Sequence, residues 1–138
     1  MPWGNCVADV VKPALVEISV NTNGTYRIEV RASIEALLTG INARYKNTRD
    51  APNAEEYDRY RVMQAADLAA AFKPFEAEFT RQVQLVFDDK PVALTVTRVD
   101  IPEPGYPKVP RISVIYLEGK VDRSVASITW YYPARFGD

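Results

Sequence analysis

The fold of this chain is decided by residues 14–31, which read ALVEISVNTNGTYRIEVR. Apolar and polar residues alternate on both sides of a central NTNG, and this alternation is typical of two half-buried strands joined by a turn. Pairing Val20 with Tyr26 puts both apolar sets on one face, whereas a two-residue turn puts them on opposite faces. The sequence therefore predicts a hairpin with a three-residue loop, residues 22–24, whose last residue, a glycine, adopts the left-handed conformation.

The apolar period changes from two to about 3.6 after this hairpin. Between residues 34 and 41 four apolar side chains recur at helical spacing, and Ser33 is in place as the N-cap, so a short helix is predicted. From about residue 54 to residue 81 the composition is again helical, although Pro74 either kinks this segment or begins a new helix. One apolar stripe is predicted along it, formed by Leu68, Ala71, Phe72, Phe75 and Phe79.

Strand alternation returns beyond residue 82. It predicts four strands, around residues 83–87, 92–96, 112–116 and 126–132. A four-residue loop, residues 88–91, is expected to join the first two. Four prolines fall within residues 101–110, which forbids a regular helix or a central strand there and indicates an extended connector. This proline-rich connector also contains P-x-x-P spacings, which peptide-binding modules recognise, but a stiff connector explains the prolines without any partner.

The order of these elements predicts the fold class. Two strands, a helical block and four further strands show no regular βαβ alternation. We therefore expect an α+β or mainly β fold, an antiparallel β-sandwich-like domain with a helical insertion, about residues 33–81, between the second and third strands. No internal repeat or domain boundary is visible, so we expect residues 1–138 to form one domain. A chain of this length can bury roughly two thirds of its unfolded surface and form a core without cross-links.

Composition excludes several classes of function. The chain has 17 basic and 18 acidic residues and a net charge of -1, which argues against a basic nucleic-acid-binding surface. It contains no histidine and a single cysteine, Cys6, so it lacks the commonest metal ligand and general base. No carboxylate pair has a spacing that forces an acid–base dyad, and no stretch is long and apolar enough to span a bilayer. We therefore expect no catalytic residue, no metal site and no cofactor, and a protein that is not an enzyme.

The most function-like stretch is residues 42–61, where hydrogen-bonding aromatics and both signs of charge are concentrated. Loops on a rigid scaffold commonly carry function, which makes this stretch the first candidate for a binding surface. A solvated helix face with i,i+4 ion pairs, such as Glu55 with Arg59, is the structural alternative. The candidate binding residues here are Asp50, Asn53, Tyr57 and Arg61.

A second candidate surface lies near the C-terminal end, where Trp130, Tyr131 and Tyr132 are consecutive. In a strand the first and third of these share one face and Tyr131 takes the other. We expect Trp130 and Tyr132 to continue a core stripe begun by Ile128, because aromatic side chains dominate core packing. Tyr131 is then the remaining candidate for binding a sugar or a peptide, and burial of the Trp130 ring would remove a larger aromatic platform.

Several short segments carry a resemblance to a known family: VKPALVEI at 11–18, YRIEVR at 26–31, IEALLTGI at 34–41, DAPN at 50–53 with Tyr57, and TW at 129–130 with RFG at 135–137. Together they resemble the N-terminal extracytoplasmic region that precedes the membrane helices in bacterial HupE/UreJ-type membrane proteins. The resemblance implies a soluble piece of a longer protein, placed after a removed signal peptide and before the first membrane span. It also implies a context of permease-like proteins linked to nickel or cobalt handling, although this chain has no imidazole for such a metal.

Two hypotheses of different classes follow. The first is a non-catalytic extracytoplasmic recognition or assembly domain, on the periplasmic side and tethered to the membrane in the full-length protein. Its partner is expected to be the membrane-embedded part of the same protein or another envelope protein, and not a nucleic acid. The alternative is an independent carbohydrate- or peptide-binding β-sandwich module that uses Tyr131, Trp130 and the proline-rich connector.

Overall fold

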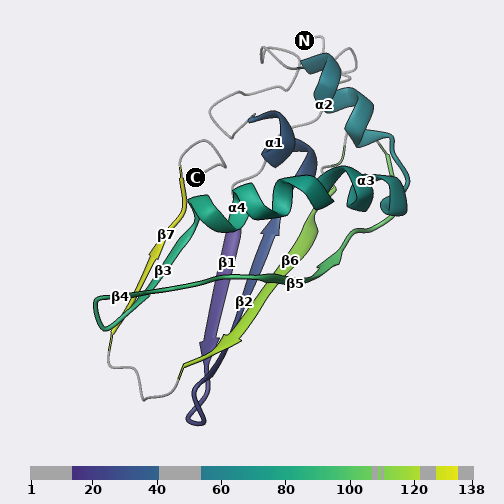
Figure 1. Ribbon diagram of the computed structural model, residues 1–138. Coiled ribbons are helices and arrows are strands. Elements are labelled where there is room, and N and C mark those ends of the chain that lie inside the picture. The colour runs from purple at the N-terminus through teal and green to yellow at the C-terminus, as the bar shows by residue number, and fades with distance from the viewer. Residues whose placement is uncertain (1–13, 41–53, 107–108, 110, 122–126, 134–138) are drawn as a thin grey trace, which may run out of the picture.

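The computed structural model describes residues 14–40, 54–106, 109, 111–121 and 127–133. Its strands form two antiparallel sheets, and its helices gather at one end of them (Figure 1). The strands are β1 (Leu15–Val20), β2 (Thr25–Ala32), β3 (Gln84–Phe87), β4 (Lys90–Val92), β5 (Val96–Asp100), β6 (Ser113–Lys120) and β7 (Ile128–Tyr131). The helices are α1 (Ile34–Thr39), α2 (Ala54–Arg61), α3 (Ala65–Phe72), the 3-10 turn η3 (Lys73–Phe75) and α4 (Glu76–Gln82). This confirms the α+β, mainly β class with a helical block between the second and third strands.

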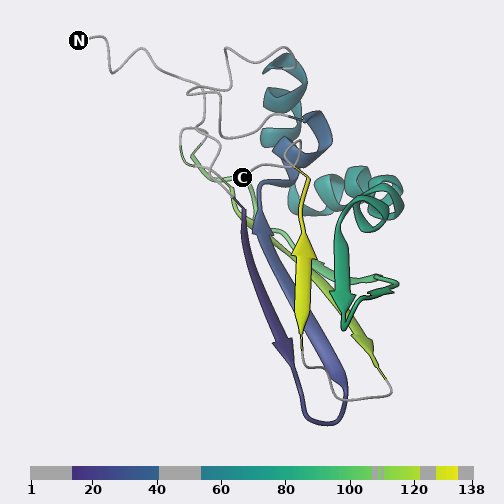
Figure 2. The ribbon, with the colours of Figure 1, turned by 90° about the vertical axis from the view of Figure 1, so that its left-hand side faces the viewer.

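The two sheets form the layers of the fold. The larger has the strand order β1-β2-β6-β5 and the smaller the order β4-β3-β7. Figure 2 shows the sheets face to face, with α3 and α4 placed above the smaller one. The core fills the space between these layers, and in it the Tyr26 ring meets the Phe87 ring edge-on, with centroids 5.4 Å apart.

The β1–β2 hairpin has the predicted register, with Val20 opposite Tyr26. The loop between them closes at Gly24, whose φ of +87° lies in the left-handed region that a glycine adopts without strain. A Cβ at this position would also overlap the carbonyl oxygen of Val121, the residue whose amide donates to the Gly24 carbonyl (2.8 Å). Glycine is therefore required here both for its conformation and for space.

The helical block follows the predicted caps and stripe. The Ala36 amide donates to Ser33 Oγ (3.1 Å) at the start of α1, and Gly40, with a φ of +77°, ends this helix. Pro74 lies in the 3-10 turn that links α3 to α4, where its missing amide disrupts no long helix. The stripe is core as predicted: Leu68, Phe72 and Phe79 are fully buried, and Ala71 and Phe75 are partly buried.

The predicted four-residue loop at residues 88–91 is wrong. Phe87 lies directly opposite Lys90, so the turn consists of Asp88 and Asp89 alone. Both residues have positive φ angles, 49° and 68°, which match the twist of a two-residue hairpin and which aspartate tolerates better than most residues. Asp88 Oδ1 also accepts a hydrogen bond from the Ser127 amide (2.8 Å), which ties this turn to the chain entering β7.

The predicted strand at residues 92–96 is divided between the two sheets. β4 ends at Val92 in the smaller sheet, and β5 begins at Val96 in the larger one. The residues between them carry the chain from one layer to the other, as the long crossing segment in Figure 1 shows. Alternation of apolar residues continues through this crossing, so periodicity alone gives no sign of the change of sheet.

Apolar residues occur on both faces of β6, and only the structure shows which face meets the core. Ile115 and Leu117 are fully buried opposite Val30 and Ile28 of β2. Tyr116 lies on the outer face of the sheet, yet it is only 7% exposed. The guanidinium groups of two arginines cover its ring, at 4.7 Å for Arg27 and 4.1 Å for Arg98.

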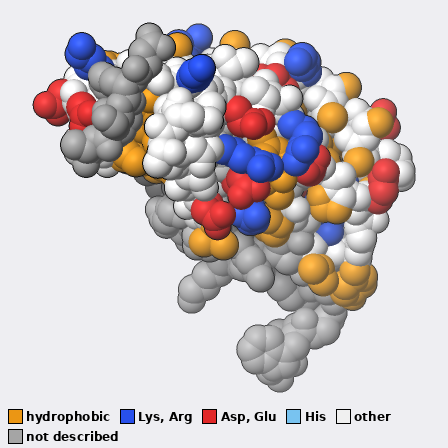
Figure 3. Space-filling model, turned by 90° about the horizontal axis from the view of Figure 1, so that it is seen from below, with side chains coloured by type: hydrophobic (Ala, Val, Ile, Leu, Met, Phe, Trp, Pro, Cys, Tyr) orange, Lys and Arg blue, Asp and Glu red, His pale blue; other side chains and the backbone are white. Residues whose placement is uncertain are grey.

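Figure 3 shows basic and acidic side chains interspersed on the face seen from below, as expected for a chain with a net charge of -1.

Candidate functional site

A buried ion pair anchors the end of the fold where the helices lie. Arg111 and Glu35 have side-chain exposures of 1% and 0%, and Arg111 Nε donates to Glu35 Oε2 at 2.9 Å. The other guanidinium nitrogens of Arg111 donate to backbone oxygens, Nη2 to Tyr60 (2.9 Å) and Nη1 to Met63 (2.7 Å) and Pro102 (3.4 Å). Because a buried charge is tolerated only when it is paired and hydrogen-bonded, this arrangement holds α1, the end of α2 and the proline-rich connector together.

A second buried arginine holds the same connector from α2. Arg61 is 4% exposed, and its Nη2 donates to the carbonyl oxygens of Tyr106 (2.9 Å) and Val109 (2.5 Å). Glu103 Oε1 accepts a hydrogen bond from the Ala65 amide (2.8 Å) at the start of α3. The backbone of the connector is thus attached to the helical block at several points along its length.

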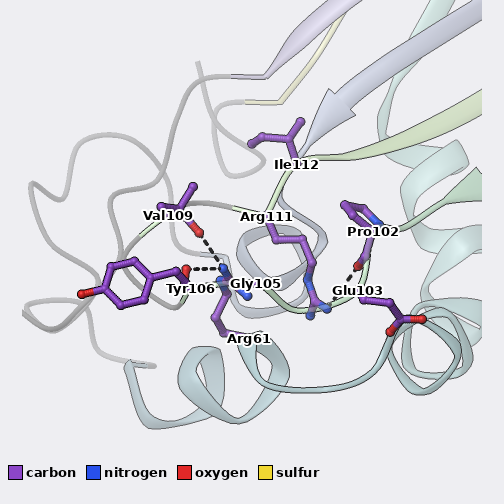
Figure 4. A pocket seen from close by; sticks show the side chains of 8 residues that line it. All are labelled: Arg61, Pro102, Glu103, Gly105, Tyr106, Val109, Arg111 and Ile112. Atoms are coloured by element: carbon purple, nitrogen blue, oxygen red, sulfur yellow. Dashed lines mark hydrogen bonds between the residues drawn. The ribbon is translucent and has the colours of Figure 1, made fainter.

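A cavity of about 270 Å³ opens between these anchors (Figure 4). It is lined by Arg61, Pro102, Glu103, Gly105, Tyr106, Val109, Arg111 and Ile112. Figure 4 shows the arginines reaching toward the backbone of the connector, while the Tyr106 ring points outward. The cavity therefore combines apolar walls with the guanidinium groups of two buried arginines.

Two large apolar side chains that line this cavity are exposed to solvent. Tyr106 is 63% exposed and Val109 is 57% exposed, although Arg61 fixes the backbone carbonyls of both. Both residues line the cavity and are held by the same buried arginine, and we call Tyr106 and Val109 the connector patch. Grouped apolar exposure of this kind marks interaction surfaces more often than scattered single residues do.

The candidate residues from the sequence fall into different places. Tyr57 is fully buried and Arg61 is 4% exposed, because both lie on the inward face of α2, four residues apart. Asp50 and Asn53 lie outside the described residues. The structure therefore gives Arg61 a role in positioning the connector and makes Tyr57 part of the interior.

Tyr131 stands apart from the others, on β7, and is 55% exposed. Trp130 and Tyr132 pack against the core and stack on each other, with ring centroids 6.1 Å apart. Burial raises the pKa of the Tyr132 phenol. The stripe does not extend back to Ile128, which is 45% exposed at the start of the strand. The exposed aromatic surface here is Tyr131 rather than a platform that includes Trp130.

The sequence reasoning missed Arg111, Glu35 and Tyr106. Glu35 stands at a polar position of the helical period, and only the structure shows that almost every residue of α1 is buried. A carboxylate there needs a cation as its partner. The partner is 76 residues away along the chain, and no local pattern names it.

Within the described residues no group of three or more potential metal-binding side chains occurs, and no helix there has the length and apolar character needed to cross a membrane. No family model matches the chain, and neither a curated protein nor a solved structure was found to be similar to it. The resemblance to HupE/UreJ-type proteins accordingly stays an expectation from the sequence.

Proposed function

We propose that this chain is a non-catalytic extracytoplasmic recognition or assembly domain of a bacterial membrane protein, and that the connector patch is its recognition surface. The observation that carries this proposal is the contrast between backbone and side chains at Tyr106 and Val109. Their carbonyl oxygens are held by a buried arginine, whereas their side chains are more than half exposed.

This contrast has a physical consequence for binding. Association requires that the groups at an interface lose conformational freedom, and a backbone that is already held loses less. Because Arg61 and Arg111 hold the backbone of the connector, its exposed side chains are already positioned before a partner binds. Tyrosine is among the residues that most often dominate interface energetics, and Tyr106 is the large aromatic side chain of the patch.

The cellular context of the proposal comes from the sequence. The segments that resemble HupE/UreJ-type proteins support a domain on the periplasmic side of the membrane, tethered to membrane helices in the full-length protein. The proposed partner is the membrane-embedded part of the same protein or another envelope protein. An association with nickel or cobalt permease-like proteins rests on the same resemblance.

Site-specific photo-crosslinking tests the proposal. A benzophenone amino acid is placed at Tyr106 in the protein produced from its own gene, and at Ile128 in a matched control. Ile128 is also exposed, at 45%, but begins β7 at the end of the sheets away from α2 (Figure 1). We expect irradiation to link position 106, and not position 128, to an envelope protein or to membrane-embedded segments of the same polypeptide.

Mass spectrometry of the cross-linked peptides identifies the partner. Equal yields at the two positions, or products that contain only cytoplasmic proteins, would refute the proposal.

A further inference from the structure

Among the described strands β1 lies at the edge of the four-stranded sheet, where its one neighbour is β2 (Figure 2). The hydrogen-bond alternation of the hairpin shows which residues face outward. The Asn21 amide donates to the Thr25 carbonyl (2.8 Å), and in an antiparallel ladder every second pair beyond this one exchanges hydrogen bonds. The backbone groups of Leu15, Glu17 and Ser19 therefore point to β2, and those of Val16, Ile18 and Val20 point away from it.

This outward edge lacks the protective features of two other outer strands, β4 and β5, and it is longer than the remaining outer strand, the four-residue β7. β4 contains Lys90 and Pro91, and β5 has an irregular register between Val96 and Arg98. Such charges, prolines and bulges discourage pairing with another chain. β1 has six residues, LVEISV, with one charge, no proline and an unbroken register.

We propose that β1 pairs antiparallel with β1 of a second copy of this chain, which joins the two four-stranded sheets across a two-fold axis. In this register Ile18 lies opposite Ile18 of the second copy, and Val16 lies opposite Val20. These are the residues whose backbone groups point outward, so each such pair exchanges two hydrogen bonds. The apolar side chains of the three residues, which already pack at the margin of the core, then form a continuous row.

Charge selects this register over its neighbours. Glu17 lies opposite Ser19 of the second copy, which places no like charges together. A shift of one pair toward the N-terminus brings Glu17 opposite Glu17 of the second copy, and like charges directly opposite are destabilising. A shift the other way brings Val16 opposite Thr22 in the hairpin loop, where the strand has ended. The pairing does not depend on the partner proposed for the connector patch.

Cysteine cross-linking tests the register. Glu17→Cys and Ser19→Cys are made separately in a Cys6→Ser background, and the two proteins are oxidised alone and as an equimolar mixture. Positions 17 and 19 of the two copies form a non-hydrogen-bonded pair, whose Cα atoms are about 4.5 Å apart, within the reach of a disulfide. We expect the mixture to form a disulfide-linked dimer several times faster than either protein alone.

Sedimentation velocity over a range of concentrations measures the dimer itself. Ser19→Glu places two like-charged pairs across the axis, so we expect the dissociation constant to rise about tenfold. Ile18→Pro removes an outward amide that β2 does not use and should abolish the dimer, whereas Ile18→Ala loses the same side chain but keeps the amide and should retain it. Circular dichroism of each variant verifies the fold.

Three results would overturn the proposal. The first is a chain that stays monomeric at every concentration, because β1 then does not pair with a second copy. The second is a dimer that Ser19→Glu and Ile18→Pro leave unchanged, since its interface then lies elsewhere. The third is cross-linking in the mixture that is no faster than in the separate proteins.

Discussion

Replacement of the buried Arg111 by methionine should strongly destabilise the fold. Methionine keeps the length of the apolar stem but removes the guanidinium. Glu35, with a fully buried side chain, then loses its cation, and the carbonyl oxygens of Tyr60 and Met63 lose a donor. Removing one partner of a buried ion pair costs about 3–5 kcal/mol, because the other charge stays buried without compensation. Against a total stability of roughly 5–15 kcal/mol, this is a large fraction.

A double-mutant cycle separates the ion pair from general packing. Glu35→Gln alone should cost about 1–3 kcal/mol, since it leaves a buried guanidinium facing a neutral amide. In the double variant neither charge of this pair remains, so we expect its loss of stability to be at least about 1 kcal/mol smaller than the sum of the two single losses. Urea unfolding followed by far-ultraviolet circular dichroism at pH 7 measures all four proteins. The reasoning is refuted if Arg111→Met costs less than about 1 kcal/mol, or if the two changes are additive.

Three further outcomes follow from the same structure. Gly24→Ala should lower the stability by about 1–3 kcal/mol, because alanine resists the positive φ and its Cβ overlaps the Val121 carbonyl; an unchanged urea midpoint would contradict this. Phe72→Ala should cost about 3–5 kcal/mol through the cavity it leaves, whereas Tyr106→Ala should stay within about 0.5 kcal/mol of the parent in the same assay. Burial raises the pKa of Tyr132, so its contribution to stability is present below the ordinary tyrosine pKa of 10.0 and is lost as the pH rises above it; pH-dependent thermal unfolding should show this fall, and Tyr132→Phe should reduce it.

The hairpin and the first helix could be predicted because their determinants are local. The parity of the apolar positions around Val20 and Tyr26 allows one loop length that aligns both sets, and Gly24 supplies the conformation that this loop needs. Ser33 and Gly40 mark the ends of α1 in the same way, since a cap acts on amides and carbonyls within one turn of itself.

Burial on α2 could not be predicted because both faces of this helix carry polar residues. Tyr57 and Arg61 have the composition of a solvated surface, yet the structure turns them inward. Arg61 is accommodated there because the connector presents backbone carbonyl oxygens to its guanidinium. Those oxygens come from residues 45 and 48 positions further along the chain, so the sequence near α2 contains no sign of them.

The sequence by itself determined the fold class, the place of the helical block between the second and third strands, the hairpin register and the apolar stripe that includes Phe72, since each depends on periodicity or on a residue within a few positions. Tertiary structure alone decided which face of β6 meets the core, because Ile115 and Tyr116 both belong to apolar runs and the choice depends on pairing with β2. It also decided the partner of Glu35 and the gathering of the connector patch. These features join segments far apart in the chain, and the free energy that selects among such pairings comes from burying charges and apolar surface together, which no local pattern encodes.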